Sequence, residues 1–173
     1  MFKYLRDLWN DSDAASLKGG QLELLRYRSN LLGADLRITN FGGGNTSSKY
    51  EVMDPLTGKP TRVMAVKGSG GDLGSITTGG FAVLYLDRLM ALENVYRGEA
   101  FEDDMVGLYP SCSFAGNTVA ASIDTPLHGY LPFDHESRGF GAHMIWRNPR
   151  VPQDEVSGQR RLVRKARSAR VAV

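Results

Sequence analysis

The chain has 173 residues, of which 42% are hydrophobic and 23% charged, with a formal net charge of +2 at pH 7. This length predicts one domain with a substantial core, and no apolar run approaches the ~20 residues that a membrane span needs. The single cysteine, Cys112, cannot form an intramolecular disulfide, and no secretory signal is recognised, so we expect a cytoplasmic protein without a membrane partner.

The charge is unevenly distributed along the chain. Residues 136–173 contain nine Lys or Arg and three Asp or Glu, so this segment carries +6 and residues 1–135 carry −4. Few large apolar residues are present there to offset the entropy of chain ordering. We therefore expect residues 136–173 to be a disordered or non-native basic tail. Nucleic-acid binding is disfavoured, because the Arg-rich end has no aromatic interleaving beyond Trp146.

The first predicted elements, in chain order, are helical. A short helix is expected around residues 4–9, and a fresh turn beginning at Ser12 or Asp13. Residues 17–32 form a longer predicted helix, because apolar residues recur at three- and four-residue steps and Gly33 is a natural C-terminal stop. Residues 35–39 alternate apolar and polar side chains, which predicts a strand.

The following elements are mainly strands joined by short turns. Residues 48–53 and 62–66 predict a hairpin, since the connection between them contains Asp-Pro and Thr-Gly. A strand over 81–86, a helix over 87–96 and a helix over 125–130 follow, the last with Pro126 in its first turn. This order favours an α/β or α+β domain with a mainly antiparallel sheet.

Two glycine-dense loops are the most informative motifs. Residues 40–47 read NFGGGNTS and residues 67–72 read KGSGGD. Glycine lets backbone amides form a concave anion site, and the neighbouring hydroxyls, amide and lysine suit a phosphate. Tight turns that glycine merely permits are an equally good interpretation. The glycine spacing misses the dinucleotide fingerprint, and no Gly-Lys-Ser/Thr closes either loop.

A third candidate segment contains Asp124 and His128, which are four residues apart and would share one face of a helix. They could serve as a general acid/base with a positioned histidine. Helix capping and a buried histidine are the interpretation that these residues alone favour. The three histidines have no metal-binding spacing and only one cysteine is present, so no metal site is predicted. A serine-hydrolase elbow is also absent from the sequence.

Five stretches of the chain together resemble the class II aldolase/adducin family, in particular the N-terminal part of bifunctional rhamnulose-1-phosphate aldolase/alcohol dehydrogenases. They are residues 24–47, 66–74, 84–88, 104–110 and 122–128. The resemblance covers residues 5–135 and implies an incomplete three-layer α/β/α domain with a mainly antiparallel central sheet, assembled as a homo-tetramer. It implies zinc-dependent retro-aldol cleavage of L-rhamnulose 1-phosphate to dihydroxyacetone phosphate and L-lactaldehyde.

The candidate substrate- and phosphate-binding residues are Gly44, Asn45, Thr46, Lys67, Ser69, Gly70 and Ser122. The resemblance implies this role for Gly44, Asn45, Ser69, Gly70 and Ser122. Thr46 and Lys67 are candidates because a hydroxyl donor and a cation beside the glycine loops suit a phosphate. Asp124 takes the place of the catalytic carboxylate that transfers protons, at the end of a Ser-Ser-Glu motif that here reads Ser-Ile-Asp. The partner expected at this site is a small sugar phosphate.

The chain departs from the family after His135. Family members continue with Val-Asp-His-x-His-Pro, whose two histidines bind zinc, whereas here Glu-Ser-Arg-Gly follows. Zinc is the electron sink for the enediolate, so we expect no metal to be bound and little activity from this chain. A reading-frame shift after His135 would explain the basic tail. The alternative is a non-catalytic sugar-phosphate-binding or interaction module of the adducin type.

Overall fold

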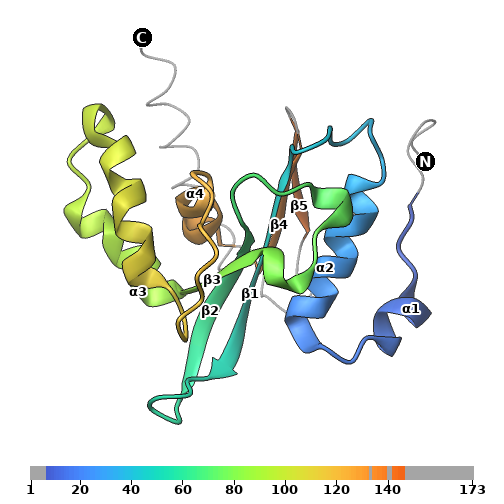
Figure 1. Cartoon of the computed structure of the whole chain (residues 1–173), viewed down its shortest axis with the longest axis horizontal. Helices are drawn as coiled ribbons and strands as arrows, with labels where there is room; N and C mark the ends of the chain where they lie inside the picture. Colours follow the sequence, from blue (N-terminus) through green and yellow to red (C-terminus); the bar gives the residue numbers. More distant parts are fainter. Residues whose placement is uncertain (1–6, 133, 140–141, 147–173) are drawn as a thin grey trace, which may run out of the picture.

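The computed structural model describes residues 7–132, 134–139 and 142–146. Its centre is one five-stranded sheet with the strand order β3-β2-β1-β4-β5, and the four pairings between neighbours are all antiparallel (Figure 1). The strands are β1 (Asn45–Met53), β2 (Pro60–Lys67), β3 (Phe81–Tyr85), β4 (His135–Gly139) and β5 (Ala142–Trp146). The predicted antiparallel sheet is therefore confirmed.

The hairpin of β1 and β2 forms as the sequence predicts, in a register that runs from Ser47 opposite Val66 to Met53 opposite Pro60. Asp54 closes the turn between these strands, since its Oδ1 accepts the backbone N–H groups of Leu56 at 2.8 Å and Thr57 at 3.1 Å. A chain reversal at this point places the first residues of β1 beside the last residues of β2.

Helices lie on both faces of the sheet, with α2 on one side and α3 and α4 on the other (Figure 1). The helices are α1 (Asp11–Ser16), α2 (Gly20–Gly33), α3 (Leu86–Ala91) and α4 (Thr125–Tyr130). The predicted helix over residues 17–32 corresponds to α2, and the prediction over 125–130 coincides with α4. The helix expected over 87–96 is α3 followed by a 3₁₀ turn, η3 (Leu92–Val95). Among the described helices none is long and apolar enough to cross a bilayer.

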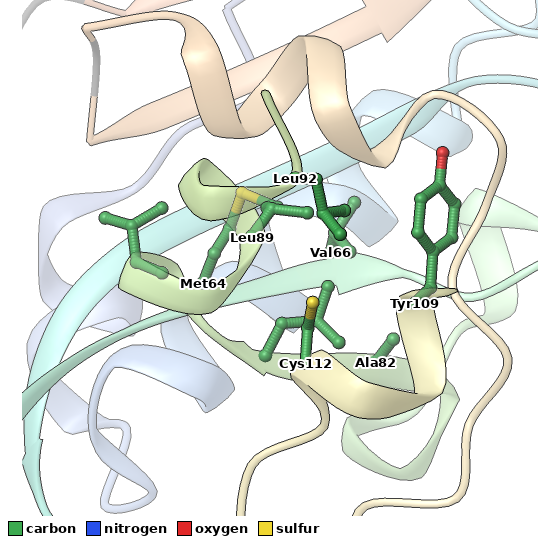
Figure 2. Packing of buried hydrophobic residues seen from close by; sticks show 9 residues of the cluster. Met64, Val66, Ala82, Leu89, Leu92, Tyr109 and Cys112 are labelled. Atoms are coloured by element: carbon green, nitrogen blue, oxygen red, sulfur yellow. The ribbon is translucent and has the colours of Figure 1, made fainter. Parts of the chain in front are cut away.

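The hydrophobic core divides between the two faces, because neighbouring residues of a strand point to opposite sides. On the α2 face, Leu25 packs with Ala65 of β2, Phe81 of β3 and Ile76. On the other face, the larger cluster surrounds Leu89 of α3 and contains the buried thiol of Cys112 (Figure 2). Its buried members are Met64, Val66, Ala82, Leu84, Leu86, Leu89, Leu92, Tyr109 and Cys112. Cys112 thus has the packing role of a small apolar side chain.

Three sequence predictions are wrong in whole or in part. The strand expected over residues 35–39 is a series of turns, in which the carboxylate of Asp35 accepts the backbone N–H of Arg37 at 3.0 Å. Short acidic side chains often accept hydrogen bonds from nearby backbone N–H groups, and such local bonds compete with strand pairing. Residues 136–139 and 142–146, expected to belong to a disordered or non-native tail, lie in β4 and β5, and β4 pairs with β1. Residues 147–173 lie outside the described residues, as do residues 4–6 of the short helix predicted around residues 4–9. Residues 7–9, the described part of that prediction, are not helical.

Candidate functional site

The two glycine loops meet at one edge of the sheet. The first loop (residues 40–44) leads into β1 and the second loop (residues 68–72) leaves β2. Since β1 and β2 are antiparallel, the two loops lie side by side. A hydrogen bond joins them directly: the backbone N–H of Gly42 donates to Oδ1 of Asp72 at 3.1 Å. In the sequence, the predicted hairpin was the feature that could indicate that these two loops are neighbours.

The backbone of both loops requires glycine at defined positions. Gly42 has φ 72°, Gly44 has φ 76° and Gly70 has φ 78°, all in the left-handed region that L side chains rarely adopt. No atom lies within 4 Å of the place where a Cβ would stand on Gly42 or Gly70. Glycine is therefore needed there for its conformation, and the space beside these backbones is open enough for a ligand to approach.

The third segment lies against the second loop. Gly68 forms an isolated antiparallel bridge with Ala121, and the N–H of Ser69 donates to the carbonyl of Ala120 at 3.0 Å. This pairing leads the chain directly to Ser122 and Asp124, which precede α4 and are both half-buried. The side chain of Asp124 does not cap α4, so the capping role considered from the sequence does not account for its carboxylate.

Lys67 is the cation at the centre of these segments. Only 4% of the residue is exposed, although it ends β2 and directly precedes the second loop. Burial lowers the pKa of Lys67 below its ordinary value, while the negative charges of Asp72 and Asp124 act in the opposite direction. Lys67 therefore lies within electrostatic range of both carboxylates.

Asn45 and Thr46 are both buried, but their surroundings differ. Thr46 is fully buried and its Oγ1 lies 2.7 Å from Oγ of Ser29, on α2. Because Ser29 donates its own proton to the carbonyl of Leu25, Thr46 is the donor in this pair. Asn45 is 3% exposed, and its Oδ1 has no hydrogen-bond partner among the described residues. Thr46 is thus held by the fold, whereas Asn45 retains an acceptor that a ligand hydroxyl could use.

Sequence reasoning missed the buried polar layer beneath the loops. Nδ1 of His128 lies 2.8 Å from Oγ of Ser47, and Nη2 of Arg28 donates to the carbonyl of Ser47 at 2.7 Å. Desolvation lowers the pKa of the Arg28 guanidinium to about 10. The sequence signal was the placement of Arg28 and Ser29 after Leu25, on the side of α2 that faces the core. His128 is a buried, hydrogen-bonded histidine, as the structural interpretation of its sequence position expected.

The predicted substrate-binding and catalytic residues differ in their exposure to solvent. Ser69 and Gly70 are exposed, Gly44, Ser122 and Asp124 are half-buried, and Asn45, Thr46 and Lys67 are buried. Within residues 7–132, 134–139 and 142–146, no three His, Cys, Asp or Glu side chains are grouped so that they could hold a metal ion. Nδ1 of His135 is directed to Oγ of Ser48 at 2.6 Å. The donor set on the described residues does not fit the zinc of class II aldolases.

Sequence comparison finds a curated relative of this chain. No family model matches the chain. The chain is 38% identical over 131 residues to "Uncharacterized oxidoreductase YuxG" of Bacillus subtilis (strain 168), a match that covers 76% of this chain and 18% of that protein. The chain thus spans less than a fifth of the length of this curated relative.

A solved structure resembles the fold of this chain. It is the N-terminal class II aldolase domain of a conserved protein from Thermoplasma acidophilum, with a TM-score of 0.66 and 24% sequence identity. The superposition covers 89% of this chain and 69% of that chain. The chain therefore has a class II aldolase-like fold, which confirms this part of the expectation from the sequence resemblance.

Proposed function

We propose that this chain is the substrate-binding part of a class II aldolase that acts on a ketose 1-phosphate. The observation that carries the proposal is the contact between the two glycine loops through Gly42 and Asp72. Backbone amides of both loops, together with the buried Lys67, would hold the phosphate. The hydroxyl groups of Ser69 and Ser122 would donate further hydrogen bonds.

Asp124 is the proposed proton-transferring group. It follows Ser122 and lies within electrostatic range of Lys67, so it would stand beside a phosphate held by the loops. A carboxylate in this place can carry the proton that moves on and off the enediolate carbon. Because the described residues do not fit the family's zinc, we expect phosphate binding without appreciable retro-aldol turnover by this chain.

The proposed substrate is L-rhamnulose 1-phosphate, which the family reaction cleaves to dihydroxyacetone phosphate and L-lactaldehyde. Two observations support a bifunctional aldolase/dehydrogenase origin: the chain has an aldolase-like fold, and it matches only 18% of a protein described as an oxidoreductase. An aldolase domain fused to a dehydrogenase would show this combination. We further propose a cytoplasmic homo-oligomer of three-layer domains, and helices on both faces of the sheet support the layering.

Calorimetric titration of the purified chain with dihydroxyacetone phosphate tests the proposal. We expect binding of this phosphate but not of dihydroxyacetone, and about tenfold or greater loss of affinity in Lys67→Met, which removes the charge but keeps the length of the side chain. Lys59→Met is the matched control, because Lys59 is an exposed lysine in the hairpin turn. Equal affinity for the phosphorylated and unphosphorylated ligand would refute the proposal. A coupled glycerol-phosphate dehydrogenase assay with added zinc measures any cleavage.

A further inference from the structure

Asp72 contacts the first glycine loop although it belongs to the second. Its Oδ1 accepts the N–H of Gly42, 30 residues away, at 3.1 Å, and its Oδ2 accepts the hydroxyl of Ser75 at 3.2 Å. The bond from Gly42 is the largest of the interactions that lower the pKa of this carboxyl group. Asp72 is therefore anionic at neutral pH, and each of its two carboxylate oxygens accepts a hydrogen bond.

The glycines of the first loop also take part in a local turn. The N–H of Gly43 donates to the carbonyl of Asn40 at 2.9 Å, which closes a local turn. Gly42 and Gly44 both adopt positive φ, and glycine has a wide choice of backbone conformations. An anion site made of backbone amides depends on their fixed direction, because ordering them during binding would reduce affinity. The bond to Asp72 connects this loop to the last residue of the second loop, directly before the 3₁₀ turn at Leu73–Ser75.

The charge of Asp72 has a second effect, on Lys67. The charged groups that act on Lys67 among the described residues are Asp72 and Asp124, and both favour its protonated form against the effect of burial. Removing the Asp72 charge would therefore lower the pKa of Lys67 further. The same change would remove a negative charge from the surroundings of a bound phosphate.

We propose that Asp72 is a positioning residue of the phosphate site, which fastens the first loop to the second. This inference rests on the proposed function for its ligand, but the link between the loops is a property of the protein alone. Asp72 was not among the residues that the sequence indicated, because an aspartate after Gly-Gly is an ordinary turn residue.

Two substitutions separate the two roles. Asp72→Asn retains an oxygen that can accept the Gly42 N–H but removes the charge, whereas Asp72→Ala removes both. Asp103→Ala is the control, because Asp103 is an exposed carboxylate of η5 (Asp103–Cys112). Affinity for dihydroxyacetone phosphate is measured by calorimetry between pH 6 and 10, and hydrogen exchange of the peptide covering residues 40–45 is measured without ligand.

We expect Asp72→Ala to lose about tenfold or more in affinity across this pH range and to exchange faster over residues 40–45. Asp72→Asn should keep near-native exchange and affinity at neutral pH, but its affinity should decline at a lower alkaline pH than that of the unaltered chain. Identical behaviour of the two variants, or native affinity and exchange in Asp72→Ala, would overturn the inference. If the unaltered chain binds no phosphate, the proposed function fails, and the exchange of residues 40–45 still decides whether Asp72 holds the loop.

Discussion

The end of α2 and the start of η1 (Leu73–Ser75) are packed so closely that a single added methyl group should separate them. A Cβ on Gly33 would lie 2.1 Å from the backbone nitrogen of Gly74 and 2.6 Å from the carbonyl carbon of Leu73. These are backbone atoms, so no side-chain rotation can relieve the contact. Gly33→Ala must therefore displace the end of α2 from the chain that follows the second loop.

The expected cost can be estimated from this contact. Overpacking of a well-packed site costs about 1–3 kcal/mol. The displacement would also weaken two hydrogen bonds at 3.1 Å from Nδ2 of Asn30 to the carbonyls of Leu73 and Ile76, each worth about 1 kcal/mol. Alanine recovers up to about 1 kcal/mol through its higher helix propensity. The net loss in the free energy of unfolding should be about 2–4 kcal/mol.

Urea unfolding followed by circular dichroism measures this loss, with Gly71→Ala as the matched control. Gly71 lies in the second loop, its Cβ would meet no atom within 4 Å, and its φ is not in the left-handed region. The control should remain within about 0.5 kcal/mol of the unaltered chain. If Gly33→Ala is as stable as Gly71→Ala, the close approach of α2 to residues 73–74 is not a feature of the folded protein, and the reasoning is refuted.

Three further predictions concern buried polar groups. Arg28→Met should lower the free energy of unfolding by about 2–4 kcal/mol in the same assay, because the buried carbonyl of Ser47 loses a charged hydrogen-bond donor. A loss below about 0.5 kcal/mol would argue against this buried hydrogen bond. Tyr85→Phe should cost about 1 kcal/mol, since the Tyr85 hydroxyl donates to Oδ2 of Asp54 at 2.9 Å, and unchanged stability would contradict this. The pKa of His135 is lowered to about 4, chiefly by desolvation. His135 of the unfolded chain therefore binds a proton more readily than His135 of the folded chain. The free energy of unfolding should fall by about 1 kcal/mol from pH 7 to 5, after allowance for the partial exposure of this side chain. His135→Asn should abolish this part of the pH dependence.

Local sequence signals predicted the elements whose stability depends on local chemistry. The hairpin of β1 and β2 was predictable because its turn residues bond to one another, as Asp54 shows. The position of α4 followed from Pro126 near its start. The strand predicted at residues 35–39 failed for a related reason: the apolar alternation was real, but the carboxylate of Asp35 satisfies the following backbone and favours turns.

The long-range arrangement could not be predicted in the same way. β4 has the sequence His-Glu-Ser-Arg-Gly, which carries no strand signal. It forms a strand by pairing with β1, a segment far away in the sequence: His135 pairs with Ser48, 87 residues earlier. The link between Gly42 and Asp72 also depends on tertiary structure, since nothing in either loop specifies the other. The sequence therefore indicated which residues could bind a phosphate, but not which side chain would hold the two loops together.

The first half of β1 shows why fold and candidate site are connected. Five consecutive polar residues at its start are buried: Asn45, Thr46, Ser47, Ser48 and Lys49. Such a strand would be costly unless its polar groups were paired. Thr46 contacts α2, Ser47 contacts α4 and Ser48 contacts His135 at the start of β4. These bonds determine where the surrounding elements lie, while Asn45, nearest the first loop, keeps its Oδ1 without a partner among the described residues. The strand thus uses most of these polar side chains to build the fold, and the acceptor at its loop end is the group that the proposed ligand would use.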